Sequence, residues 1–93
     1  MYASVRSYDD PSLAGALAAR ADEIRAVIGE VPGLRAYYLV QGSEKTVTVT
    51  VCDDQAGAEE SNRVAALWLR DNMPELGSGV VPTVHAGSVL LDV

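Results

Sequence analysis

The sequence predicts an α+β fold whose elements follow the order β-α-β-β-α-β. Residues 45–52 contain Thr and Val in strict alternation, which is typical of a strand because β-branched side chains favour extended backbone. Two other segments, one on each side of a predicted hairpin, place apolar residues at helical spacing. Ninety-three residues suffice for one domain, which we expect to span residues 1–93.

The composition argues against several kinds of partner. A formal net charge of −6 is unfavourable for nucleic-acid binding, which needs clustered Lys and Arg. No apolar run approaches the roughly 20 residues of a membrane-spanning helix. The N-terminus lacks the pattern of a signal peptide, and a single cysteine fits a reducing compartment. We therefore expect a cytoplasmic protein that binds neither nucleic acid nor membranes.

The first half of the chain predicts a strand and one long helix. Residues 2–8 alternate small or apolar with larger polar side chains, as a strand does. Asp10 is a good N-cap and Pro11 suits the first helical position, while Gly29 suits the position after a helix end. The apolar stripe of this helix consists of Leu13, Leu17, Ile24, Val27, Ile28 and Val31.

The next segment predicts a hairpin. Residues 34–40 form its first strand, and the short, Gly-containing stretch 41–44 leads into the Val/Thr strand. These two strands should therefore be neighbours in an antiparallel sheet.

The last part of the chain predicts a second helix and a final strand. Asp53 or Asp54 can cap the helix, and Met73 with Pro74 should end it. Residues 75–81 predict a loop, and residues 83–91 a strand.

Right-handed crossovers place both helices on one face of the sheet, which is the ferredoxin-like plan with strand order 4-1-3-2. Alternation then divides the strand residues between two faces. We expect the following residues to face the helices: Ala3, Val5, Leu34, Ala36, Tyr38, Val47, Val49, Val51, Val84 and Leu90. We expect the opposite face to carry Ser4, Arg6, Tyr8, Arg35, Tyr37, Leu39, Thr46, Thr48, Thr50, His85 and Val89.

The second set is too apolar for open water and too polar for a core. It predicts a homodimer through this sheet face, with two-fold symmetry. On the other face, Trp68 should anchor the second helix on Val47, Val49 and Val51.

Three stretches carry a resemblance to a known group of proteins. Pro32-Gly33-Leu34 enters the second strand, Tyr37-Tyr38 follows, and residues 53–62 open the second helix. Together with the element order, they resemble the dimeric α+β barrel superfamily, and most nearly its antibiotic-biosynthesis-monooxygenase-like branch. The resemblance covers essentially all 93 residues. It implies two sheets packed into a dimeric barrel, with a cavity between each sheet and its helices or loops.

Characterised members of that superfamily include cofactor-free oxygenases acting on polyketide phenols, haem-degrading enzymes and proteins with no known activity. The oxygenases use an Asn, a Trp and a Tyr around their substrate, and Asn62, Trp68 and Tyr37 are of these types. The haem-degrading branch needs an axial His on a helix. The only histidine, His85, falls in a predicted strand, so we expect no haem and no other cofactor.

The candidate catalytic residues are His85, Tyr37 and Arg6, which the predicted alternation places on one sheet face. His85 would act as a general base or hydrogen-bond partner, and Arg6 and Tyr37 would stabilise a phenolate. The simpler interpretation makes His85 an interface or surface residue. The candidates for substrate binding are Thr48, Asn62 and Trp68, although a tryptophan at helical spacing is more often a core residue.

Metal and thiol chemistry are not expected. One histidine and the distant Cys52 form no ligand pattern for a metal. The neighbouring Asp53 and Asp54 disfavour a thiolate at Cys52, so we expect an inert thiol.

Two classes of function remain open. The first is a small cofactor-independent oxidoreductase, monooxygenase-like, acting on a small aromatic or polyketide-type substrate that supplies electrons to O2. The second is a non-catalytic homodimer that binds a small molecule or regulates a partner. Alanine-rich helices leave room for a cavity and favour the first class, whereas the scarcity of His, Cys and clustered carboxylates favours the second.

Overall fold

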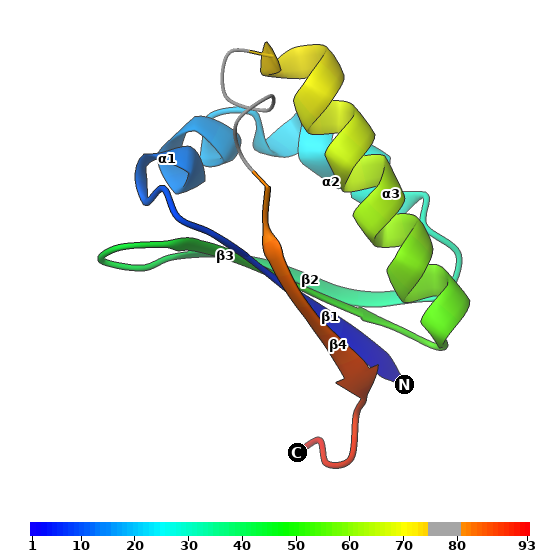
Figure 1. Ribbon diagram of the computed structural model, residues 1–93. Helices are drawn as coiled ribbons and strands as arrows, with labels where there is room; N and C mark the ends of the chain where they lie inside the picture. Colours follow the sequence, from blue (N-terminus) through cyan, green and yellow to red (C-terminus); the bar gives the residue numbers. More distant parts are fainter. Residues whose placement is uncertain (75–80) are drawn as a thin grey trace.

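In the computed structural model, three helices cover one face of a four-stranded antiparallel sheet (Figure 1). The structure describes residues 1–74 and 81–93. The strand order β2-β3-β1-β4 confirms the predicted ferredoxin-like plan. No described helix is long and apolar enough to cross a membrane. The elements are β1 (Tyr2–Tyr8), α1 (Ser12–Ala18), α2 (Ala21–Gly29), β2 (Leu34–Gln41), β3 (Thr46–Cys52), α3 (Gln55–Asn72) and β4 (Thr83–Ser88).

The first predicted helix is divided into α1 and α2 at Arg20. Its backbone leaves the helical region, with φ −119° and ψ 32°, and its carbonyl oxygen accepts from the backbone N–H groups of Glu23 and Ile24 to start α2. The Arg20 guanidinium also pairs with Glu23 and donates to the backbone carbonyl of Asn72 at 2.9 Å. Asn72 lies 52 residues further along the chain. The apolar pattern around Arg20 therefore gives no indication of this contact at the break between the two helices.

The start of α3 follows the sequence prediction. Asp54 is the N-cap, and its Oδ1 accepts from the backbone N–H of Gly57 at 2.9 Å. A Cβ added at Gly57 would lie 2.7 Å from the carbonyl oxygen of Pro32, so only glycine lets the first turn approach this closely. The helix ends at Asn72, next to the predicted stop at Met73 and Pro74.

The last strand is shorter than predicted. Of the predicted loop over residues 75–81, residues 75–80 lie outside the described part of the chain. Strand β4 ends at Ser88, and one further backbone hydrogen bond joins the N–H of Val89 to the carbonyl of Met1. The terminal segment then leaves the sheet, where Leu90 is 94% exposed (Figure 1).

The predicted assignment of the two sheet faces is wrong. The helices cover the alternate residues of β1 and β3 that carry Ser, Arg, Tyr and Thr, each of them at most 3% exposed. These residues are Ser4, Arg6, Tyr8, Thr46, Thr48 and Thr50. We call this the covered face. The open face carries most of the set that was expected to contact the helices, namely Ala3, Val5, Ala36, Tyr38, Val47, Val49 and Val51.

Hydrogen bonds explain why a row of threonines is buried. Thr46 Oγ1 donates to the carbonyl of Asp10 at 2.7 Å and accepts from the N–H of Ala14 at 2.9 Å. A buried hydroxyl with such partners avoids most of its desolvation penalty, whereas a valine here would leave the N–H of Ala14 without this acceptor and the carbonyl of Asp10 with only the N–H of Leu13 among the described donors. Alternation shows that a strand has two different faces, but it does not show for which face the helices supply hydrogen-bond partners.

The outer strands follow the prediction only in part: Leu34 and Val84 face the helices and His85 does not, as predicted, whereas the rest of β2 is reversed. A bulge between Leu34 and Ala36 shifts β2, so Leu34 joins Tyr37 on the covered face. On β4, Val84 pairs with Arg6 and His85 pairs with Val5. His85 therefore lies on the open face, although the sequence predicted that it shares a face with Arg6.

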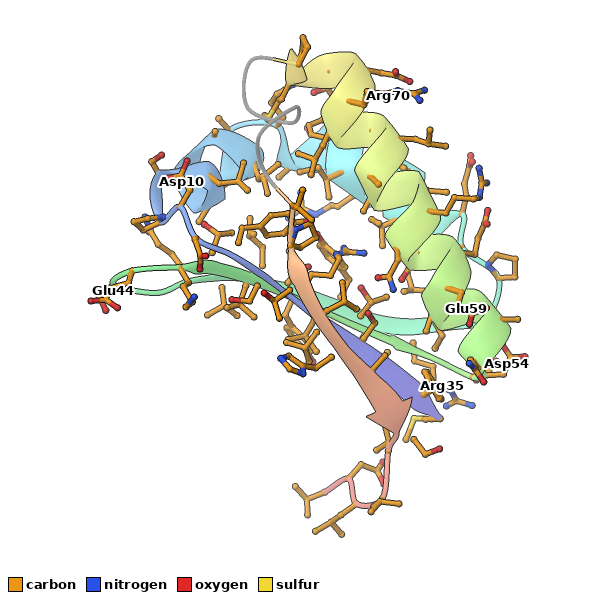
Figure 2. The ribbon with its side chains drawn as sticks, in the orientation of Figure 1. Asp10, Arg35, Glu44, Asp54, Glu59 and Arg70 are labelled. Carbon is orange, nitrogen blue, oxygen red and sulfur yellow. The ribbon has the colours of Figure 1, made fainter. Side chains whose placement is uncertain are left out.

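The main buried cluster lies between the covered face and the helices. Its fully buried members are Tyr8, Leu13, Leu17, Leu69 and Met73. Trp68 packs against this cluster rather than on the valines of β3, which corrects the predicted anchor of α3. Figure 2 shows side chains filling this space, while the labelled charges of Arg35, Glu44, Glu59 and Arg70 lie around the outside.

Candidate functional site

A buried arginine lies between the sheet and the helices. Arg6 is 2% exposed, and its Nε donates to Thr48 Oγ1 at 3.1 Å. Its Nη1 donates to Asn62 Oδ1 at 2.8 Å and to the backbone carbonyl of Ser61 at 3.2 Å. These acceptors are neutral, and within residues 1–74 and 81–93 Arg6 forms no ion pair with a carboxylate. A buried cation without an acidic partner is unusual and attracts anions.

Strand pairing and one turn of α3 build this arrangement. Arg6 on β1 is directly opposite Thr48 on β3, so their side chains meet on the covered face. Consecutive positions of α3 supply the carbonyl of Ser61 and the amide oxygen of Asn62. The hydroxyl of Ser4 also donates to Asn62 Oδ1, at 2.9 Å. The guanidinium is thus held in one orientation by groups from two strands and one helix.

Two tyrosines lie beside the guanidinium. Burial raises the pKa of the Tyr8 hydroxyl, and the charge and hydrogen bond of Arg6 offset part of that rise. Burial likewise raises the pKa of Tyr37, again with an opposing effect of Arg6. Both side chains are therefore neutral phenols near pH 7, able to donate a hydrogen bond to an anion.

Two neighbouring spaces border these groups. The central cavity, lined by Arg6, Tyr37 and Trp68 among others, leaves about 30 Å³ for a bound molecule, which is room for one or two waters. A larger space of about 280 Å³ lies between α2 and β2, and we call it the α2–β2 cleft. The two share Leu17, Ile24, Ile28 and Tyr37 as walls, whereas Arg6 lines only the central cavity.

Most of the residues chosen from the sequence gather here. Arg6, Tyr37, Thr48 and Trp68 line the central cavity, and Asn62 is hydrogen-bonded to Arg6. Their catalytic and binding roles stay predictions. The exception is His85, which is exposed on the open face and separated from Arg6 by the sheet. The reversed facing of β1 is the reason for this error, because Arg6 lies on the covered face while β4 keeps its predicted phase, with Val84 toward the helices and His85 away from them.

Sequence reasoning missed two contributors to the site. Tyr8 stands two residues after Arg6 on the same strand, so alternation alone placed it beside the candidate, yet it was not chosen. Ser61 acts through its backbone carbonyl, for which no side-chain pattern exists.

The remaining reactive groups lie elsewhere. Cys52 is a buried free thiol, and burial, then Asp54 and Asp53, raise its pKa. Among the described residues, no group of three or more His, Cys, Asp or Glu is arranged to hold a metal ion. The only histidine of the chain is His85, so the central cavity does not fit a haem held by an axial histidine.

Solved structures share this architecture. A mutant of MhuD with two manganese protoporphyrin IX molecules per active site has a TM-score of 0.72 and 18% identity, covering 100% of this chain and 98% of that chain. MhuD is a heme-degrader from Mycobacterium tuberculosis. A mutant of SnoaB, a cofactor-independent oxygenase from Streptomyces nogalater, has a TM-score of 0.66 and 13% identity, covering 99% and 95%.

A third similar structure is NE2512, a protein of unknown function from Nitrosomonas europaea, with a TM-score of 0.70, 21% identity and coverage of 99% and 90%. No family model and no curated protein matches the sequence. At these identities the likeness establishes the fold alone, which is the ferredoxin-like α+β fold that the sequence predicted.

Proposed function

We propose that this chain is a small cofactor-independent oxidoreductase, monooxygenase-like, acting on an aromatic or polyketide-type substrate that carries an acidic phenol. One observation carries the proposal. Arg6 is a buried cation held by neutral groups beside a cavity with aromatic and aliphatic walls. Such a site favours the anionic form of a flat apolar molecule, because the guanidinium lowers the pKa of a bound phenol.

The two spaces suggest how the substrate lies. Its rings would occupy the α2–β2 cleft, and its oxygen would pass Tyr37 to reach Arg6. The neutral hydroxyls of Tyr8 and Tyr37 would donate to the same oxygen. Because the central cavity is small, Tyr37 must move when substrate enters, which makes it part of the binding site in this proposal.

The chemistry needs no bound cofactor if the substrate itself reduces O2. The phenolate donates electrons through the ring to O2, and a ring methylene becomes a carbonyl. The methylene loses four electrons, one oxygen atom stays as the new carbonyl, and the other leaves with the two methylene hydrogens as water. In this proposal Arg6 stabilises the electron-rich anion that reacts, and the apolar walls exclude water from it.

Proton removal does not involve His85 in this proposal, since that residue is on the opposite face. Within the described part of the chain, the residues lining the central cavity include no carboxylate and no imidazole. The phenol would therefore transfer its proton to water, and Arg6 would favour ionisation by stabilising the product. This departs from the role for His85 that the sequence suggested.

A chromogenic phenol tests the binding step directly. The spectrum of 4-nitrophenol reports its ionisation, and we expect the bound form to ionise at lower pH than the free form. Arg6→Met should abolish this shift, whereas Arg35→Met, which removes the same charge from the periphery, should preserve it. An unchanged shift in Arg6→Met would contradict the proposed role of Arg6, provided that thermal melting shows the variant folded.

Oxygen consumption distinguishes the enzyme from the alternative. With a hydroxyanthrone as substrate, we expect uptake of O2 that Arg6→Met lowers by about 100-fold, as the loss of one charge-stabilising group does. The alternative is a non-catalytic homodimer that binds a small molecule, which is favoured by the water-sized central cavity and by the lack of a base among its described lining residues. A phenol that binds and ionises without O2 uptake would establish that alternative.

The partner in solution would be a second copy of the chain. The open face exposes Tyr38 to 59% and Val40 to 46%, next to the partly exposed valines of β3. One structure of this fold is a dimeric ferredoxin-like protein. The homodimer would thus use the valine face rather than the threonine row predicted from the sequence. We place this dimer in the cytoplasm, where a free Cys52 stays reduced.

A further inference from the structure

A space other than the central cavity also borders Arg6. It lies between α3 and β4, measures about 350 Å³, and is here called the α3–β4 cleft. Ala66, Leu69 and Val84 are among its aliphatic walls, and Arg6, Tyr8 and Asn62 form its polar part. Arg6, Tyr8 and Leu69 border both this cleft and the central cavity. One buried cation therefore borders two separate spaces.

The polar part of this cleft contains hydrogen-bond donors, but its described lining residues include no acidic side chain that could accept from them. The amide oxygen of Asn62 already accepts from Arg6 and Ser4, which fixes the orientation of the amide. Its Nδ2 group donates to no described residue, so this N–H remains available in the cleft. A carboxylate beside Arg6 would gain a charge-assisted hydrogen bond, and the amide of Asn62 would supply a second donor.

The walls of the two spaces differ in kind. The central cavity and its extension present Trp68 and Tyr37, which suit a flat aromatic ring. The α3–β4 cleft presents alanine, leucine, valine and proline side chains around one cation. Such a lining suits a short aliphatic chain with an acidic end, since the chain gains by burial and the acid neutralises the guanidinium.

We propose that the α3–β4 cleft is a binding site for a small aliphatic carboxylic acid, in which Arg6 and Asn62 donate hydrogen bonds to the carboxylate. The inference goes beyond the oxygenation of an aromatic substrate and requires no turnover. Because both ligands need the same guanidinium, the acid and the phenol exclude one another. An aliphatic acid would thus act as a competitive inhibitor of the aromatic site.

Hexanoate is a suitable probe, and hexanamide is its neutral control of nearly the same shape. Adjacent alanines of α3 provide matched variants, because Ala65 lines the central cavity and Ala66 lines the α3–β4 cleft. Calorimetric titration should show saturable hexanoate binding that Ala66→Leu weakens by about tenfold and Ala65→Leu leaves nearly unchanged. For 4-nitrophenol the same two variants should have the reverse effects, and hexanamide should not bind.

Asn62→Asp places a carboxylate of the protein beside Arg6 with almost no change in shape. It should abolish hexanoate binding while the melting temperature stays at or above that of the parent chain. Hexanoate binding that survives Asn62→Asp, or that responds equally to Ala65→Leu and Ala66→Leu, would overturn the site. Absence of saturable binding in the folded parent chain would do the same. Failure of O2 uptake would leave this binding result standing, so the two proposals fail separately.

Discussion

The two faces of the sheet bury opposite kinds of side chain. The covered face contains an arginine, two tyrosines and a row of threonines, yet the helices enclose it. The open face contains valines and alanines, yet no described element covers it. In an isolated chain the more polar face is therefore the more buried one, which reverses the usual preference.

Hydrogen bonding accounts for the covered face, and association would account for the open one. Thr46 and Thr48 have hydrogen-bond partners, so their burial costs little, and neutral acceptors hold the guanidinium of Arg6. The valines would gain their burial only when a second chain packs on them. A polar strand face can thus be the buried one when its side chains find hydrogen-bond partners, while the apolar face stays open for a second chain.

Adjacent residues of β3 give the largest expected contrast. Thr48→Arg places a second guanidinium next to Arg6 with no acid to pair with it, which should cost at least about 4 kcal/mol and prevent folding. Val49→Arg places the same side chain on the open face, where it should leave the fold intact and weaken the dimer. Circular dichroism and analytical ultracentrifugation measure the two results.

The reverse outcome would support the facing predicted from the sequence, in which the valines of β3 face the helices. In that case Thr48→Arg would remain folded and become monomeric, while Val49→Arg would fail to fold. A monomeric parent chain at micromolar concentration would instead remove the association argument and leave the open face unexplained.

The sequence predicted the order of elements better than the orientation of the sheet. Strand order, hairpin and the cap at Asp54 follow from local patterns, and each is confirmed. The facing of β1 and β3 depends on whether Thr46 and Arg6 find partners 30 or more residues away. The alternation of residue types within one strand does not contain this information. The valines were therefore predicted to face the core only because apolar side chains are usually buried.

The site shows the same limit. Arg6, Tyr37 and Thr48 were grouped correctly because alternation relates residues on paired strands. His85 was included because the facing of β1, which carries Arg6, was predicted in the reverse sense, whereas the predicted facing of β4 is the observed one. The α3–β4 cleft also depends on the placement of β4, so no sequence pattern indicated it.

Trp68 should be the next most sensitive position. It packs on the buried cluster of the covered face, and the Arg20 guanidinium lies 5.0 Å from the centre of its ring. Trp68→Ala should lower the free energy of unfolding by about 3 kcal/mol, near the lower end for large-to-small changes because the ring is only partly buried. Urea denaturation measures this loss, and a change below about 0.5 kcal/mol would mean that α3 packs by another face.

Alkaline pH should destabilise the covered face specifically. The folded-state pKa values of Tyr8 and Tyr37 are raised above the ordinary 10.0, mainly by burial. The folded chain therefore binds more protons than the unfolded chain above that pH. Their contribution to stability is complete below pH 10 and declines as pH rises through the folded pKa values.

Unfolding free energies measured between about pH 8 and 11 test this linkage. The double variant Tyr8→Phe and Tyr37→Phe removes both titrating hydroxyls and should flatten the decline. Tyr38→Phe, on the open face, is the matched control and should leave the decline as it is. An equal decline in the double variant would show that other groups control alkaline unfolding.

The smallest changes in the free energy of unfolding are expected for the threonines of the covered face, and they should differ from one threonine to the next. Thr46→Val removes hydrogen bonds to Asp10 and Ala14 and should cost about 2 kcal/mol, while Thr48→Val leaves Arg6 Nε unpaired and should cost about 1.5 kcal/mol. Thr50 differs, because its buried Oγ1 has no hydrogen-bond partner in the described part of the chain. Thr50→Val keeps the shape and removes an unsatisfied hydroxyl, so it should stabilise the fold by about 0.5 kcal/mol. Urea denaturation of the three variants gives the order, and a loss of more than about 1 kcal/mol in Thr50→Val would show that this hydroxyl has a partner, such as a bound water or ligand.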